Sequence, residues 1–100
     1  RQRTTLVKKA LSISRSRHTA TRLPGGRVLL VGGLGPAGTL DTAEIYDPGA
    51  SSFNLLKAKL NTSRQQHTAT RLPDGRVLII GGWGKGKTLL SGEIFDPKGE

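Results

Sequence analysis

The segment 81–88 reads G-G-W-G-K-G-K-T and satisfies the phosphate-binding pattern G-x-x-x-x-G-K-T. A phosphate loop of this kind holds the anion with backbone amides and with the N-terminus of the helix that follows it. Residues 89–97, however, read as a strand and contain a glycine and a proline. We therefore expect no nucleotide hydrolysis, and only weak anion capture by the glycine-rich backbone with Lys85 and Lys87.

Two histidines, His18 and His67, are the other side chains that could transfer protons or bind metal near neutral pH. Each lies in the same string, H-T-A-T, and the chain contains no cysteine, which excludes disulfides and thiolate metal sites. We expect both histidines to pack or hydrogen-bond within the fold. A metal held by symmetry-related histidines of a ring is the alternative. We expect no catalytic residue, cofactor or metal site, and hence no enzyme.

The elements that position these residues are repeated at an offset of 49 residues, the separation of the two histidines (67 − 18). Residues 15–51 and 64–100 are identical at 21 of 37 aligned positions. A period of about 50 residues fits one four-stranded propeller blade. Because about three stacked repeats are needed for stability, we expect the ring to be completed by oligomerisation or by further chain.

Each copy is expected to form an antiparallel β-meander, because short apolar runs alternate with turns rich in glycine, proline and aspartate. The expected strands are 18–23, 27–31, 43–46 and 52–57, followed by 68–72, 76–80 and 92–95. The chain stops at Glu100, where the fourth strand of the second copy should begin, and residues 4–9 align with a fourth strand. We divide the chain into an N-terminal strand equivalent (1–13), a first repeat (14–62) and a second repeat lacking its fourth strand (63–100).

The signature R-x-x-H-T-A-T-x-L-P-(D/G)-G-R-V-L with a closing G-G, followed by E-I-(Y/F)-D-P, resembles the kelch repeat in its bacterial, galactose-oxidase-like form. The resemblance covers nearly the whole chain and implies an all-β fold of about two kelch-type β-propeller blades. It implies that Glu44 and Tyr46 lie on the third strand of a blade. The departures are Phe53, where kelch repeats usually carry tryptophan, and Gly92 in place of Ala43.

The copper-radical chemistry of galactose oxidase is not expected, because it needs a tyrosine cross-linked to cysteine and this chain has one tyrosine and no cysteine. Residues 4–9 would supply an extra fourth strand, and the second repeat lacks one. The sequence therefore predicts a homo-oligomer in which the N-terminal strand of one copy pairs with the open edge of the second repeat of another. Three copies would give six blades, which we favour, and four would give eight. The alternative is a two-blade fragment of a larger propeller protein or galactose-oxidase-like enzyme whose catalytic residues lie elsewhere.

The formal charge of +9, from 16 basic and 7 acidic residues, points to acidic partners. In a meander, the connections between the second and third strands and between successive repeats emerge on one face, and they carry six of the basic residues: Arg15, Arg17, Lys59, Arg64, Lys85 and Lys87. The candidate partner-binding residues on this face are Arg15, Arg17, Arg64, Trp83, Lys85 and Lys87. Arginine forks bind carboxylates and phosphates, so an acidic protein or a polyanion is the expected partner. Arg15 and Arg64 also repeat in step with Glu44 and Glu93, which predicts ion pairs between strands.

Two partner classes are not expected. Sequence-specific recognition of nucleic acid would need more aromatic stacking surface than Trp83 alone supplies. No apolar run approaches the roughly 18 residues of a membrane-spanning helix, so no membrane contact is expected either. The absence of cysteine is compatible with any compartment, and the localisation stays open. The sequence thus predicts a non-catalytic scaffold that binds protein or polyanion through a basic loop face.

Overall fold

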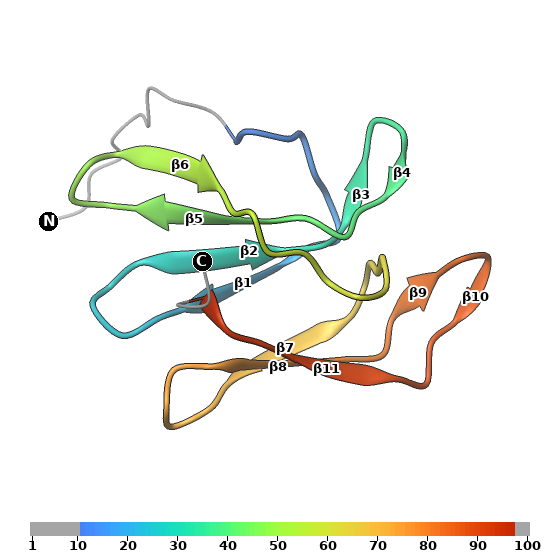
Figure 1. Ribbon diagram of the computed structural model, residues 1–100. Coiled ribbons are helices and arrows are strands. Elements are labelled where there is room, and N and C mark those ends of the chain that lie inside the picture. Colours follow the sequence, from blue (N-terminus) through green and yellow to red (C-terminus); the bar gives the residue numbers. More distant parts are fainter. Residues whose placement is uncertain (1–10, 98–100) are drawn as a thin grey trace, which may run out of the picture.

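The computed structural model describes residues 11–97, which form two antiparallel sheets and two short hairpins (Figure 1). The first sheet, in the order β1-β2-β5-β6, comprises β1 (Thr19–Arg22), β2 (Val28–Val31), β5 (Ala43–Asp47) and β6 (Ser52–Leu55). The second sheet, in the order β7-β8-β11, comprises β7 (Thr68–Arg71), β8 (Val77–Ile80) and β11 (Gly92–Phe95). The all-β prediction is confirmed, and each of these strands lies within two residues of its predicted bounds. The strand expected at residues 4–9 lies outside the described residues.

The first turn of each sheet is built from the repeated L-P-x-G-R string. The Leu23 amide donates to the Arg27 carbonyl at 2.8 Å, and the Leu72 amide donates to the Arg76 carbonyl at 2.7 Å. Proline suits the first central position of such a turn. Gly75 has a φ of +93°, which residues other than glycine rarely adopt. The same sequence signal therefore sets the register of β1 on β2 and of β7 on β8.

Each repeat also contains a short hairpin where the sequence predicted a loop. In the first repeat β3 (Leu34–Gly35) pairs with β4 (Gly38–Thr39), and in the second β9 (Trp83–Gly84) pairs with β10 (Lys87–Thr88). The turn between β9 and β10 has φ +52° at Lys85 and +77° at Gly86, as a type I′ hairpin turn requires. The segment that matches a phosphate loop is thus a hairpin.

The core lies between the two sheets, which pack with β1 beside β7 (Figure 1). It comprises Leu23, Leu29, Val31, Ala43, Ile45, Leu60, Val77, Ile79 and Phe95. Because side chains alternate along a strand, Leu29 and Val31 share one face of β2, and Val77 and Ile79 share one face of β8. By the offset of 49, the β8 counterparts of Leu29 and Val31 are Leu78 and Ile80. The first sheet therefore buries the face that carries Leu29 and Val31, whereas the second sheet buries the opposite face, which carries Val77 and Ile79. This is how repeats stack when each one packs its front face on the back of the next.

Candidate functional site

Arg15 and Arg64 lie at equivalent buried positions in the segments that precede β1 and β7. Arg15 Nη2 is 2.9 Å from Glu44 Oε2, with both side chains fully buried. Arg64 Nη2 is 3.2 Å from Glu93 Oε2 in the second repeat. The predicted pairing of Arg15 with Glu44 and of Arg64 with Glu93 is confirmed, but the two arginines lie outside the strands. The pairs join residues 11–18 and 60–67, which we call the lead-in segments, to the third strand of each sheet.

Both terminal nitrogens of the Arg15 guanidinium are hydrogen-bonded within the fold, whereas its Nε is buried without a hydrogen-bond partner among the described residues. Its Nη1 donates to the carbonyls of Gly32 at 2.9 Å and Thr42 at 3.0 Å, which are the end of β2 and the approach to β5. The Glu44 carboxylate in turn accepts the backbone amides of Ser12 at 2.8 Å and Ile13 at 3.1 Å. A buried charge is tolerated only when it is paired and hydrogen-bonded, and this cradle satisfies both conditions.

The second repeat contains the same cradle. Arg64 Nη1 donates to the carbonyls of Gly81 at 3.0 Å and Ser91 at 2.9 Å. The Glu93 carboxylate accepts the amides of Asn61 at 2.7 Å and Thr62 at 3.2 Å. Two of the six predicted partner-binding residues, Arg15 and Arg64, are thus enclosed by their own repeats and serve the fold.

The other four predicted residues lie at one end of the molecule, where both short hairpins project; we call it the hairpin end (Figure 1). Arg17 is exposed, and its Nη1 is 3.4 Å from Gln65 Oε1. Gln65 exchanges two backbone hydrogen bonds with Trp83, of 2.9 and 2.8 Å. Trp83 is exposed, and Lys85 and Lys87 extend from the same hairpin. Gln65, which the sequence did not single out, therefore links Arg17 to the β9–β10 hairpin.

The two ends of the molecule differ in charge. At the hairpin end, Lys85 and Lys87 of the β9–β10 hairpin form no salt bridge with any acidic side chain of the described residues. At the opposite end Asp74 Oδ2 lies 2.7 Å from Arg76 Nε in an exposed pair. Hydrogen bonds from the Arg76 backbone and side chain lower the pKa of Asp74, which keeps that carboxylate charged. The two ends thus differ in ion pairing: Lys85 and Lys87 are exposed with no described salt bridge, whereas Arg76 is paired with Asp74.

The two histidines occupy different environments. His67 is buried, and its Nε2 lies 2.9 Å from Thr19 Oγ1 of the first sheet. Burial lowers the pKa of His67, assisted by the charge of Arg64 and opposed by the backbone of Val31. His18 is half-buried, and burial again lowers its pKa. Within residues 11–97 no three histidine, aspartate or glutamate side chains gather as a metal site.

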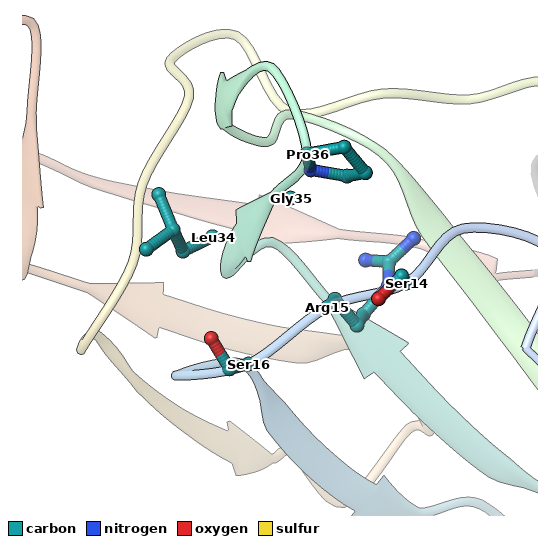
Figure 2. A pocket seen from close by; sticks show the side chains of 6 residues that line it. All are labelled: Ser14, Arg15, Ser16, Leu34, Gly35 and Pro36. Atoms are coloured by element: carbon teal, nitrogen blue, oxygen red, sulfur yellow. The ribbon is translucent and has the colours of Figure 1, made fainter.

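A hollow of about 390 Å³ lies beside the first lead-in segment and the β3–β4 hairpin (Figure 2). It is lined by Ser14, Arg15, Ser16, Leu34, Gly35 and Pro36. The one charged side chain in this lining, Arg15, is already paired with Glu44. Lys85 and Lys87 of the β9–β10 hairpin do not line this hollow. Apart from Arg15, its lining consists of small polar residues, a leucine, a glycine and a proline.

Among the described residues no helix is long and apolar enough to cross a membrane. A scan against protein-family models gave no match, and a search of curated proteins gave none either. The hairpin end consists of an exposed tryptophan, Trp83, beside the exposed Lys85 and Lys87, carried by two stacked antiparallel sheets.

Proposed function

We propose that this chain is a non-catalytic, kelch-type β-propeller scaffold, whose copies assemble through their blade edges and bind an acidic protein or polyanion at the hairpin end. One observation carries the proposal. The two repeats stack as successive antiparallel sheets with β1 beside β7, which is the arrangement expected of two neighbouring blades. Repeat architectures of this kind need further neighbours to bury their outer faces.

The edge of the second sheet supports assembly. In the first sheet β6 covers β5, whereas β11 is the outer strand of the second sheet within residues 11–97. Tyr46 of β5 stands opposite Phe53 of β6, with ring centroids 4.7 Å apart. If the N-terminal segment of another copy pairs there in the same register, Thr4 would pair with Phe95 and Thr5 with Ile94. A strand added there would remove an exposed sheet edge.

The hairpin end supports the binding role. Trp83 offers an exposed aromatic ring, and Lys85, Lys87 and Arg17 offer cations that no described acidic side chain neutralises. Polyanions and acidic segments are attracted by such a field over roughly a Debye length, about 8 to 10 Å at physiological salt. In a ring the same group of residues would recur once per copy, which favours multivalent partners.

Light scattering of the purified chain across a range of concentrations tests the scaffold. The expected result is a concentration-independent mass of three chains, or of four. The variant with Thr5→Cys and Ile94→Cys should then form disulfides between chains, since opposed strand residues lie within disulfide reach and the natural chain has no cysteine. A monomer that aggregates or unfolds would instead support a two-blade fragment of a longer propeller protein or enzyme.

A further inference from the structure

The geometry points to a second contact between copies: the outer face of the second sheet docks on the first lead-in segment of the next copy, reproducing the interface between the two sheets of one chain. This inference rests on the proposed assembly and names the surfaces it uses. The outer face comprises Leu78, Ile80 and Ile94, and we call it the open face. Its partner is a second copy of this chain.

The interface inside the chain supplies the template. The Gly33 amide donates to the Arg64 carbonyl at 2.9 Å, and the Arg64 amide donates to the Leu40 carbonyl at 3.1 Å. The Gln66 amide donates to the Arg17 carbonyl at 2.9 Å. The second lead-in segment thus lies along the first repeat and is held by backbone groups. Backbone hydrogen bonds do not depend on side-chain identity, so the first lead-in segment can make the same set with another copy.

Equivalent residues of the two sheets differ in burial because only one of the sheets is covered. Val31 is 0% exposed and its counterpart Ile80 is 47% exposed. Ile45 is 4% exposed and its counterpart Ile94 is 51% exposed. Leu90, at 97% exposed, aligns with Asp41, whose carbonyl accepts the Leu60 amide across the interface. The open face is therefore the same apolar surface that the first sheet buries.

The hollow beside the first lead-in segment is the complementary surface (Figure 2). At the equivalent place on the second repeat, Gln65 Nε2 donates to Thr39 Oγ1 at 2.9 Å and the Arg64 amide meets Leu40. The Thr39 hydroxyl and the Leu40 carbonyl therefore contact that place. By the offset of 49, the Thr88 side chain and the Leu89 carbonyl of a neighbouring copy would contact Ser16 and the Arg15 amide beside the hollow of the first repeat.

Gly32 and its counterpart Gly81 also show that the first repeat is covered by a neighbour and the second is not. A Cβ at Gly32 would lie 2.5 Å from the Arg64 carbonyl oxygen and 2.9 Å from His67 Cε1, so the second repeat can approach only a glycine there. A Cβ at Gly81 would meet only the Leu89 carbonyl oxygen, at 3.7 Å. Within one chain Gly81 thus has room for a side chain. In the assembly it would face Arg15 and His18 of the next copy.

The two surfaces are different from each other, so the contact is head-to-tail. Such a heterologous contact closes into a ring when its rotation permits, and it does not give a twofold dimer. The hydrogen bond between His67 and Thr19 inside the chain has its counterpart between Thr68 of one copy and His18 of the next. This pairing distinguishes the proposed contact from any symmetric one.

The first test compares Gly81→Asn with Gly86→Asn. Both glycines have left-handed φ, +71° and +77°, a region that asparagine tolerates, and a Cβ at Gly86 meets nothing within 4 Å. Gly81→Asn should fall to the mass of one chain, and because two repeats alone are marginally stable, it should unfold at a lower denaturant concentration than the natural oligomer. Gly86→Asn should keep the mass of the natural protein. Equal masses for Gly81→Asn and the natural oligomer would overturn the inference.

The second test mixes two single-cysteine variants, Thr68→Cys and His18→Cys, with a short bismaleimide. A head-to-tail contact predicts covalent dimers in the mixture and none in either variant alone. Dimers of Thr68→Cys by itself, or none in the mixture, would exclude the head-to-tail contact while leaving the scaffold intact if the natural chain still assembles. A natural chain that stays monomeric at every concentration would overturn the proposed assembly and this contact together.

Discussion

His67 of the second sheet and Thr19 of the first face each other across the sheet interface, with Nε2 2.9 Å from Oγ1. They belong to the same H-T-A-T string of successive repeats, and the contact joins the histidine of one repeat to the threonine of the other. His67 is therefore a structural side chain whose neutral form suits a buried position. Because His67 lies at the interface, substituting it should change the stability of the packing between the two sheets.

Stability should decrease in mild acid because of His67. Burial lowers its pKa below the ordinary 6.5, so the unfolded chain takes up the proton first as the pH falls. The free energy of unfolding should thus be greatest above about pH 6.5 and should fall as the pH approaches the lowered value. Urea unfolding between about pH 5 and 8 measures this, and His67→Gln should flatten the profile.

His18→Gln is the matched control, because burial also lowers the pKa of His18, but this residue is only half-buried. We expect it to flatten the profile less than His67→Gln does. An acid-induced loss of stability that is unchanged in His67→Gln would show that the buried imidazole is not its origin.

Arg64→Met should destabilise the protein by about 3–5 kcal/mol, because it leaves the largely buried Glu93 carboxylate without its countercharge and frees the carbonyls of Gly81 and Ser91. Denaturant unfolding at neutral pH measures the change. Arg76→Met is the control: its pair with Asp74 is exposed and solvent-screened, and little change is expected. Equal effects of the two variants would contradict the structural role of the Arg64 cradle.

Gly32→Asn should weaken the contact between the sheets, by about 1–3 kcal/mol as for other overpacked cores. Asparagine accepts the φ of +64°, but its Cβ would press on the Arg64 carbonyl and the His67 ring. Both Gly32→Asn and Gly81→Asn place asparagine at a left-handed φ, but only Gly32→Asn adds the clash. Denaturant unfolding of the two variants, compared at a concentration where both are monomeric, therefore isolates the effect of the clash on the free energy of unfolding. Equal stability of the two variants would show that the close approach at Gly32 is not needed.

Removal of two cations at the hairpin end should weaken polyanion binding and its dependence on salt. Lys85→Asn creates an Asn-Gly pair that suits the type I′ turn, and Lys87→Gln removes the second charge. With a mixed-sequence DNA duplex as a generic polyanion, the slope of log affinity against log salt should fall by roughly 2. Fluorescence anisotropy at several salt concentrations measures it.

The matched control removes the same charge from the opposite end, with Arg27→Gln and Arg76→Gln. These two arginines flank the turn-proximal ends of β2 and β8, away from the hairpins (Figure 1). We expect this double variant to keep most of the affinity. An equal loss in both double variants would assign binding to net charge rather than to the hairpin end.

The sequence by itself predicted the strands of both meanders, because alternation and turn-forming residues act over a few neighbouring positions. The L-P-x-G-R string specifies its turn in each repeat. Equal spacing also predicted that Arg15 pairs with Glu44 and Arg64 with Glu93. The β3–β4 and β9–β10 hairpins were missed, since two-residue strands have no periodicity, although Lys85-Gly86 has the positive φ values of a hairpin turn.

The tertiary structure alone decided which basic residues remain available to a partner. Arg15 and Arg17 are two positions apart, yet one is enclosed with a carboxylate and the other is exposed beside Gln65. Val31 and Ile80 likewise occupy the same repeat position, but Val31 is buried against the second sheet whereas Ile80 is exposed. Local sequence sets which face of a strand a residue takes, whereas its burial depends on a neighbour distant in sequence, because desolvation is a property of the packed interface.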